Sequence, residues 1–273
     1  MTDTTEMNDI KRIKQIKHVF FENAYKKYLG HLPSALSCLE ILYVLYNKCA
    51  KIDEYNYKSI NRDKVIISKE HSRFAQVCVL YEKGLVPFDV IENYMTDGGL
   101  AGHDMFNFVG TDKIAAIDIA SGSLGLGLSV GVGLALANKN NNIYVVVGDG
   151  ELQEGSCWEA LMFIGQNKLK NLIVVIDCNR EQIDDYTKNI INTTEFAPSA
   201  IKQFGFDVIE CDGHNIIDLE QALNKENTDL PRCVIANTIK GKELRFMQEN
   251  LGCAYFHWQF MQKKDYERAI KGI

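Results

Sequence analysis

The sequence predicts an α/β fold, a mostly parallel sheet with helices on both faces. Short runs of β-branched and apolar residues alternate with helical stretches of about 10–15 residues, an order that gives right-handed crossovers between parallel strands. The run Ile143–Val147 carries β-branched residues on both faces, as in a strand covered on both sides. Only four prolines occur in 273 residues, and no repeat or low-complexity linker divides the chain. We therefore expect residues 1–273 to form one domain.

The first part of the chain is predicted to be mainly helical, because its apolar residues recur at helical spacing. The expected elements are helices at residues 6–29 and 35–49, a strand at 63–68 and a helix through Phe74, Val77 and Tyr81. The stretch 95–113 is rich in Gly, Asp and Asn and is predicted to be a long loop. Loops of that length in compact domains are usually functional or disordered.

Strands and helices alternate in the remainder. The expected elements are strands at 114–119, 143–147, 172–177, 207–210 and 233–237, and helices at 123–138, 154–168 and 216–224. Ligands of such sheets bind beyond the carboxyl ends of the strands. We therefore look for functional residues where these strands end.

Composition excludes several classes of protein. The chain has 30 basic and 36 acidic residues, a net charge of -6, which argues against broad binding of nucleic acid or anionic membranes. The run Leu124–Ala137 is too short and too rich in glycine for a membrane span of about 20 residues, and the N-terminus lacks a signal-peptide pattern. Eight scattered cysteines without a Cys-x-x-Cys pair are typical of free thiols in a reducing cytosol. We expect a cytoplasmic protein.

Two neighbouring strands end in polar residues. The first runs into Gly148-Asp149-Gly150-Glu151, and the next ends in Asp177-Cys178-Asn179. Since 28 residues, one helix and one strand, separate Gly150 from Asn179, the two strand ends should lie side by side. A carboxylate and an amide oxygen there suit Mg²⁺ or Ca²⁺ held jointly with phosphate. The alternative is that Asp149 caps the following helix and Asn179 only turns the chain.

A glycine-rich segment, Ser121–Gly127, leads into the helix predicted at 123–138. Exposed amides at a helix N-terminus bind phosphate. Gly125, Gly127 and Gly131 also resemble a nicotinamide dinucleotide fingerprint, with Asp149 in place of the ribose-binding acid. A third interpretation is a helix whose glycines allow close packing in the core.

Four of the six histidines are candidates for proton transfer. His31, His71 and His103 lie in polar turns flanked by Gly or Ser, and His257 lies beside aromatic residues. Imidazole titrates near neutrality, so a cluster of them could move protons. A lone histidine is more often structural, and their spacing does not show whether these four meet.

Together these motifs resemble the thiamine diphosphate-binding N-terminal half of transketolase, in the form of a separate subunit. The resemblance covers about residues 10–260, and its most specific part is Gly148-Asp149-Gly150-Glu151-Leu152-Gln153-Glu154-Gly155 followed by Asp177-x-Asn179. The other matching motifs are Gly30-His31 with Ser34, Asn61-Arg62-Asp63, Ser68-Lys69 with His71, Gly102-His103, Ser121-Gly122-Ser123-Leu124-Gly125, Asp212-Gly213-His214 and Lys240-Gly241-Lys242.

The resemblance implies a role for each of these residues. Mg²⁺ (or Ca²⁺) would be held by Asp149, Asn179 and the backbone carbonyl of Glu181. Thiamine diphosphate would be lined by Gly122, Ser123, Leu124 and Gly150, with His71 and Lys240 near it and Lys69 adding positive charge. The catalytic proton carriers would be His31, His103 and His257. Glu154 resembles a carboxylate that faces the other half of the active site, and His214 is assigned to a structural turn.

The resemblance also implies a partner. In this family a glutamate on a second domain activates the cofactor, and the chain ends at Ile273, where that domain would begin. We expect ketol transfer from a ketose to an aldose only with a separate C-terminal subunit, as an α2β2 assembly. One departure is Glu70, which replaces the usual Gly and places a negative charge beside the site. Alternatives are another thiamine diphosphate enzyme subunit (a ketolase for modified sugars or a 2-oxo-acid dehydrogenase α-subunit), a nicotinamide-dependent dehydrogenase and a degenerate regulatory subunit.

Overall fold

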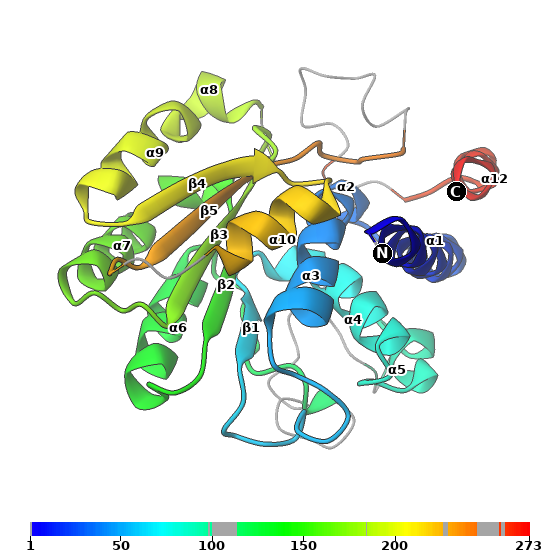
Figure 1. Cartoon of the computed structure of the whole chain (residues 1–273). Helices are drawn as coiled ribbons and strands as arrows, with labels where there is room; N and C mark the ends of the chain where they lie inside the picture. The colour runs from blue at the N-terminus through cyan, green and yellow to red at the C-terminus, as the bar shows by residue number, and fades with distance from the viewer. Residues whose placement is uncertain are drawn as a thin grey trace.

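A parallel five-stranded sheet lies at the centre of the molecule. The computed structural model describes residues 2–97, 99, 114–183, 185–225, 229–244, 257 and 260–273. The strands are β1 (Lys64–Ile67), β2 (Ile143–Gly148), β3 (Leu172–Cys178), β4 (Asp207–Asp212) and β5 (Arg232–Asn237). Their order is β1-β2-β3-β5-β4 and every neighbouring pair is parallel (Figure 1). The predicted α/β class is confirmed.

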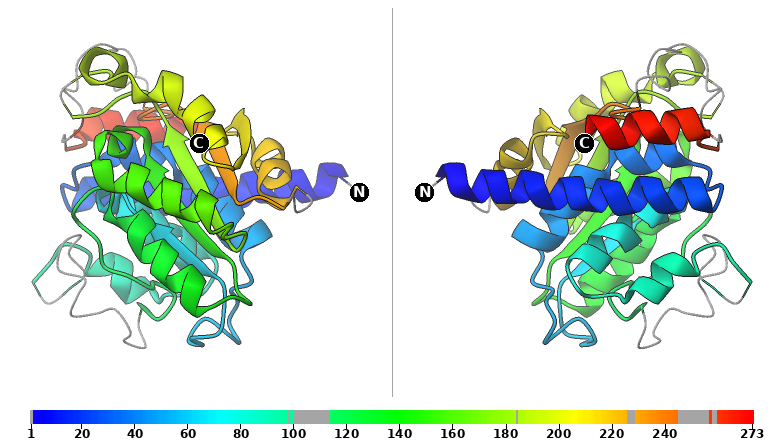
Figure 2. Two further views of the ribbon diagram at one scale, coloured as in Figure 1. Left: turned by 90° about the vertical axis from the view of Figure 1, so that its left-hand side faces the viewer. Right: turned by 90° about the vertical axis from the view of Figure 1, so that its right-hand side faces the viewer.

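Helices cover both faces of the sheet (Figures 1 and 2). One face carries α1 (Thr2–Lys26), α2 (Leu32–Ser37), α3 (Leu39–Val44), η1 (Leu45–Cys49), α4 (Arg73–Glu82), α5 (Phe88–Glu92), α10 (Ile216–Asn224) and α12 (Lys263–Gly272). The other carries α6 (Leu126–Ala137), α7 (Gly155–Gln166) and α9 (Thr193–Gln203). The short η2 (Glu70–Ser72), η5 (Asp149–Gln153) and α8 (Thr187–Ile190) belong to the connections. No helix in the described part of the chain is both long and apolar enough to cross a membrane.

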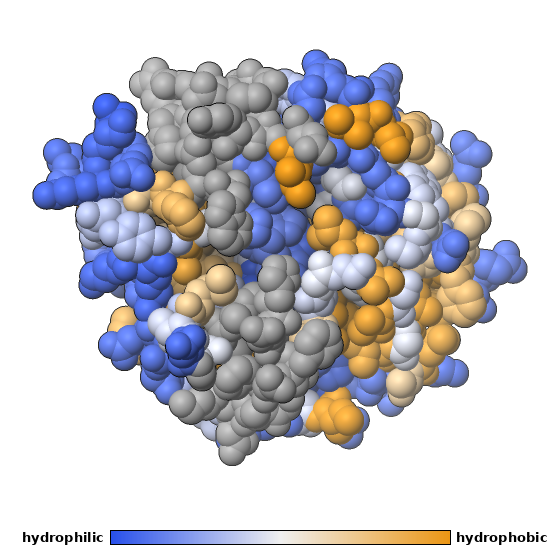
Figure 3. Space-filling view, turned by 180° about the vertical axis from the view of Figure 1, so that it is seen from behind, coloured by the Kyte–Doolittle hydropathy of each residue, from blue (hydrophilic) through white to orange (hydrophobic). Residues whose placement is uncertain are grey.

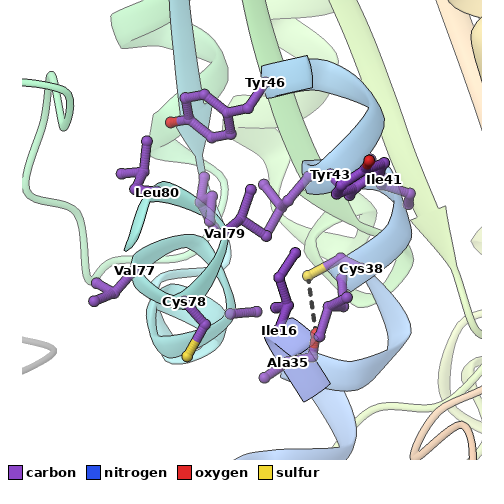
Figure 4. Packing of buried hydrophobic residues seen from close by; sticks show 14 of the residues in the cluster. Ile16, Ala35, Cys38, Ile41, Tyr43, Tyr46, Val77, Cys78, Val79 and Leu80 are labelled. Atoms are coloured by element: carbon purple, nitrogen blue, oxygen red, sulfur yellow. Dashed lines mark hydrogen bonds between the residues drawn. The ribbon is translucent and has the colours of Figure 1, made fainter. Parts of the chain in front are cut away.

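The alternation of side chains along each strand creates two hydrophobic cores. Tyr144 and Val146 of β2 join the core beneath α1, α3 and α4, whereas Val145 and Val147 join the core beneath α6 and α7. In the first core, side chains of α3 and α4 interdigitate around Ile16 of α1 (Figure 4). This packing fixes α2, which begins immediately after His31, one of the predicted site residues.

The first and last helices lie side by side (Figure 2). The rings of Tyr25 in α1 and Tyr266 in α12 stack with their centroids 4.8 Å apart. The N-terminal helix was predicted to within a few residues, whereas α12 and α9 were not predicted.

The strand predicted at 114–119 is wrong. Ile117 donates a backbone hydrogen bond to Ile114 O at 2.8 Å, so this apolar run forms a turn. Arg62 explains the difference, because its guanidinium donates to the carbonyl of Ala115 at 2.7 Å and to the carboxylate of Asp118 at 2.9 Å. The buried cation thus takes up a backbone acceptor that a strand neighbour would have used.

Two predicted helices have different bounds. The run 35–49 is divided into α2, α3 and η1, and the helix predicted from residue 123 begins at Leu126. Gly125 precedes it with a φ of 84°, a left-handed conformation that glycine adopts at little cost. Most of the predicted loop 95–113 lies outside the described residues.

Candidate functional site

A cavity of about 370 Å³ lies at the carboxyl ends of β2 and β3. The predicted metal and diphosphate residues in its wall are Gly122, Leu124, Asp149, Gly150, Asn179 and Glu181. The other predicted residues in its wall are His31, Lys69, His71, Glu154, Lys240 and His257. Ser123 is exposed next to the wall, and His103 lies outside the described residues.

Asp149 and Asn179 come together because their strands are neighbours. β2 and β3 pair in parallel with Gly148 opposite Asp177. The Asp149 carboxylate accepts a hydrogen bond from the backbone N–H of Gly150 at 2.9 Å and another from the backbone N–H of Arg180, the residue after Asn179. The bond from Arg180 joins the two strand ends, as expected, and neither bond caps α7.

The charge of Asp149 is in an unfavourable environment. Its side chain is buried, and burial together with the neighbouring Asp177 raises the pKa of Asp149 to about 7. A bound cation would favour the charged carboxylate here. The amide of Asn179 is fixed nearby, since its oxygen accepts from Glu181 N at 3.0 Å and its nitrogen donates to Ser37 Oγ at 3.3 Å.

These donors fit a hard divalent cation. Carboxylate, amide and backbone carbonyl oxygens are the ligands that Mg²⁺ takes alongside phosphate. Among the residues that the structure describes, no three His, Cys, Asp or Glu side chains are arranged as a metal cluster. A metal here would therefore rest on one carboxylate, neutral oxygens and the phosphates of its ligand.

Lys69 is paired beneath the cavity. Its ammonium contacts the carboxylate of Asp177 and donates to Ser34 O at 3.0 Å and Ser37 Oγ at 3.3 Å. Although burial opposes it, Asp177 raises the pKa of Lys69. The positive charge expected to act on the cofactor is thus balanced within the protein. Asp177 also accepts from Thr238, so this carboxylate links three segments.

Glu70 is also paired, contrary to the unbalanced negative charge that its sequence position suggested. Both Glu70 oxygens bond to the guanidinium of Arg73, and both side chains are only 1% exposed. The same carboxylate accepts from Ser121 Oγ at 2.6 Å and Ser121 N at 3.2 Å. Glu70 therefore holds the turn that leads to Gly122.

Glu151 lines the same cavity, and the sequence analysis did not single it out. Its Oε1 accepts from Ser68 Oγ at 2.6 Å and Gly125 N at 2.8 Å, and its Oε2 accepts from Gly148 N at 2.7 Å. Burial raises the pKa of Glu151. One carboxylate thus ties the end of β2 to the turn before α6. Its place in the Gly-Asp-Gly-Glu motif was the available signal.

The glycines of α6 serve close packing. A Cβ on Gly127 would lie 2.5 Å from Ser68 Cβ, and one on Gly131 would lie 2.6 Å from a Val145 methyl group. Contacts that short do not occur, so only glycine lets α6 lie this close to β1 and β2. Close packing accounts for the spacing that resembled a dinucleotide fingerprint.

Three of the four candidate histidines meet in the cavity. The ring centroids of His31 and His71 are 5.2 Å apart, those of His31 and His257 are 4.9 Å apart, and those of His71 and His257 are 5.3 Å apart. Burial, with Lys69 as a further cause, lowers the pKa of His71 well below its usual range. Burial and then Lys240 lower the pKa of His257 to about 3. Both imidazoles are therefore neutral at pH 7.

Lys240 reaches the loop after Asn179 from the end of β5. It follows β5, and its ammonium donates to Gln182 O at 3.1 Å. Burial lowers the pKa of Lys240 to about 8, with Glu181 opposing the shift. Among the described residues, Gln182 Oε1 and His257 Nδ1 are buried without a hydrogen-bond partner, and both residues line the cavity. Such atoms suit a polar ligand.

Large apolar side chains are exposed in the cavity wall and on the neighbouring helices. Ile183 lines the cavity yet is 56% exposed. Beyond it, large exposed apolar residues lie on α6, α7 and the α8–α9 segment: Leu126, Val130, Leu136, Met162, Phe163, Ile190, Ile191 and Phe196. Figure 3 shows apolar surface gathered on the side of the molecule that these helices occupy. We call these eight residues and Ile183 the apolar face.

The fold and this site define a thiamine diphosphate-binding protein of the transketolase type. The sequence matches the family described as "Transketolase, thiamine diphosphate binding domain" over residues 8–251, and the chain belongs to that family. The resemblance noted in the sequence is thereby confirmed. The transketolase from Leishmania mexicana has the same fold, with a TM-score of 0.80 and 24% identity, over 95% of this chain and 40% of that one.

Relatives of similar length are named as subunits. The chain is 37% identical over 244 residues to the 6-deoxy-6-sulfo-D-fructose transketolase subunit SqwG of Clostridium sp. (strain MSTE9), over 86% of each chain. It is 36% identical over 270 residues to an apulose-4-phosphate transketolase subunit of Actinobacillus succinogenes, over 96% of this chain and 95% of that one. These comparisons support the role of a transketolase subunit.

Proposed function

We propose that the chain is the N-terminal subunit of a thiamine diphosphate-dependent transketolase that transfers a two-carbon ketol unit from a ketose to an aldose. Residues 1–273 would form a single domain that binds Mg²⁺ and the cofactor's diphosphate. The observation that carries the proposal is the junction of Asp149 and Asn179 at neighbouring strand ends, in a cavity that also holds three histidines.

The metal and diphosphate would be held at this junction. Asp149, Asn179 and the carbonyl of Glu181 would bind Mg²⁺, whose charge would offset the burial of the carboxylate. Gly150 would allow the diphosphate to approach the backbone, since a Cβ there would already lie 3.3 Å from Gln182 Cβ. Lys240 would place its ammonium beside the same loop.

The histidines would transfer protons. Thiamine diphosphate, when bound, supplies the carbanion that ketol transfer needs. His257 is neutral at pH 7 and therefore able to accept the proton of a sugar hydroxyl. His31 packs against it and would share this role, with His103 as the third member outside the described residues. His71, the more deeply buried ring, would orient the other two.

A separate C-terminal subunit would complete the site. The relatives named as subunits support this, and so does the apolar face, which extends from Ile183 in the cavity wall over α6, α7 and the α8–α9 segment and which another protein chain would cover. We infer that the apolar face contacts that subunit in an α2β2 assembly, with Glu154 in the cavity wall directed to the junction. Seven free cysteines in the described part of the chain favour the cytoplasm.

Cofactor titration tests the metal assignment. The complex of both subunits should bind thiamine diphosphate only with Mg²⁺, and Asp149→Ala should abolish this binding while both chains remain soluble and assembled. Asp229→Ala is the matched control, because that carboxylate is 94% exposed. Retained affinity in Asp149→Ala contradicts the metal site.

Kinetic assays test the division into two subunits. Purified alone, the chain should show no ketol transfer, and activity should appear when equal amounts of this chain and the C-terminal subunit are mixed. Vigorous activity of the isolated chain contradicts the shared site. Binding of the cofactor without turnover, with the cognate subunit present, would instead indicate a regulatory role.

A ketose with a modified carbon chain is a second candidate for the donor. It is favoured by the names of the two relatives above, which specify 6-deoxy-6-sulfo-D-fructose and apulose-4-phosphate. The assembled enzyme should be assayed with these two sugars and with ordinary ketose phosphates. A higher kcat/KM for the ordinary sugars would reject the modified donor.

A further inference from the structure

His214 lies between β4 and α10, and its ring contacts both α3 and the loop after β5. Its Nε2 accepts a hydrogen bond from the backbone N–H of Ile239 at 2.9 Å, so this nitrogen carries no proton. Its Nδ1 lies 3.1 Å from Glu40 Oε2 and therefore donates to that carboxylate. The ring thus spans from α3 to the residue immediately before Lys240.

Glu40 is held in turn by α1. Lys17 Nζ lies 2.6 Å from Glu40 Oε1 and 2.6 Å from Glu243 Oε1. The side chains of Lys17, Glu40 and His214 are at most 8% exposed, so these charges interact with little screening by solvent. Glu243 and Ile239 lie in the same loop after β5, so this chain of contacts begins and ends in one loop.

The loop that carries Lys240 is therefore attached at three points. Ile239 is held by His214, Gly241 N donates to Pro33 O at 3.0 Å, and Glu243 is held by Lys17. The backbone of this loop is unusual, since Gly241 has a φ of 70° and Glu243 a φ of 72°. A left-handed non-glycine residue is unfavourable, so outside contacts are needed to maintain this conformation.

Because Lys240 is next to Ile239, the attachment fixes the direction of its side chain. Lys240 is 5% exposed and reaches the carbonyl of Gln182, in the loop that follows Asn179. A small rotation of the 239–240 backbone would withdraw the ammonium from that loop, because the side chain is long and the displacement grows along it.

We propose that His214 is a positioning residue for the cofactor site, acting through Lys240. Its neutral Nδ1–H tautomer, selected by Glu40, presents the acceptor that fixes the Ile239 amide and so aims Lys240 at the diphosphate-binding loop. This goes beyond the structural turn to which the sequence assigned it, and it rests on the proposed function only for the nature of the ligand.

Two substitutions separate the two nitrogens of the ring. In His214→Asn the side-chain amide still donates to Glu40, but nothing accepts from Ile239. In His214→Gln the amide oxygen reaches the Nε2 position and accepts from Ile239. Exposed His18 of α1 provides the control His18→Asn. Each variant is compared in the complex with the C-terminal subunit, after thermal unfolding shows that it is folded.

Hydrogen exchange provides a measurement that needs no cofactor. We expect the peptide covering 238–244 to exchange about 10-fold faster or more in His214→Asn, and at nearly the wild-type rate in His214→Gln and His18→Asn. Unchanged exchange in His214→Asn overturns the proposal. Equal acceleration in the Asn and Gln variants also overturns it, because the acceptor would then not be the feature that matters.

A double-mutant cycle connects the loop to the cofactor. His214→Asn should weaken Mg²⁺-dependent thiamine diphosphate binding about 10-fold, and it should have no further effect in the Lys240→Met background. A purely structural role would give the same loss in both backgrounds and contradicts the proposal. Absence of cofactor binding in the wild-type complex would instead refute the proposed function, and the exchange result would still decide the role of His214.

Discussion

The ammonium of Lys69 and the carboxylate of Asp177 form a buried ion pair directly beneath the junction of β2 and β3. Their side chains are 2% and 0% exposed, and 108 positions separate them in the sequence. The pair joins the segment after β1 to the end of β3. It therefore supports the floor of the cavity.

Lys69→Met should destabilise the protein substantially. Removing the cation leaves the Asp177 carboxylate buried and unpaired, a change that costs about 3–5 kcal/mol in other proteins. Urea unfolding of wild type and variant measures this loss. Lys170→Met is the control, because Lys170 and Asp229 form an exposed pair that should contribute about 0–1 kcal/mol. A similar small loss in both variants would show that Lys69 does not stabilise the floor.

His257→Asn should lower kcat about 10²–10⁴-fold, the usual contribution of a general base, while leaving the affinity for thiamine diphosphate nearly unchanged. The physical reason is that His257 packs against the other two histidines, which we assign to proton transfer, whereas we assign the diphosphate to Asp149, Asn179 and Lys240. Steady-state kinetics and cofactor titration on the assembled enzyme separate the two effects. A loss confined to cofactor affinity would assign His257 to binding.

A charge on the apolar face should weaken assembly with the C-terminal subunit. Val130→Glu and Met162→Glu each place a carboxylate on a side chain that is 40% or 48% exposed and that we expect the partner to bury. We expect at least about a 10-fold higher dissociation constant by sedimentation. Ile60→Glu is the control, since Ile60 is 74% exposed in the loop before β1 and does not belong to the apolar face. Equal effects at all three positions would argue against this interface.

Glu40 should make stability depend on acid pH. Although burial opposes it, the bonds from His214 and Lys17 lower the pKa of Glu40 below its ordinary value of 4.5. Its contribution is therefore complete above pH 4.5 and is lost as the pH falls through the folded-state pKa. Glu40→Gln should reduce the free energy of unfolding at pH 7 by about 1–3 kcal/mol. The difference from wild type should narrow toward pH 3, and a constant difference would contradict the assignment.

The sequence was sufficient to predict the centre of the site because strand order is a backbone property. Two parallel strands joined by one helix are usually neighbours, so the adjacency of Asp149 and Asn179 was predicted from their positions alone. The consecutive strands β3 and β4, which β5 separates, show that the rule has exceptions. Strand 114–119 was predicted wrongly because an apolar run does not reveal a distant buried cation such as Arg62, which bonds to its backbone.

The partners of most buried charged side chains could not be predicted from the sequence for the same reason. The partners of Lys69 and His214 depend on how distant segments pack together, and no spacing rule specifies these contacts. The Glu70 pair is different, because Arg73 follows three residues later, a spacing at which oppositely charged side chains can meet. The charges of Lys69 and Glu70, which the sequence suggested would act on a ligand, are therefore both paired inside the protein. His31, His71 and His257 also meet only through packing, from three separate segments.

His31 occupies a backbone conformation that suits another amino acid. Its φ is 56° and its ψ 19° at the residue that precedes α2. Glycine would relax this position, yet glycine has no imidazole to offer a substrate. The left-handed conformation thus costs stability at a residue whose imidazole we assign to proton transfer. Engineering this protein for heat resistance would therefore have to keep His31, although glycine would relieve the strain.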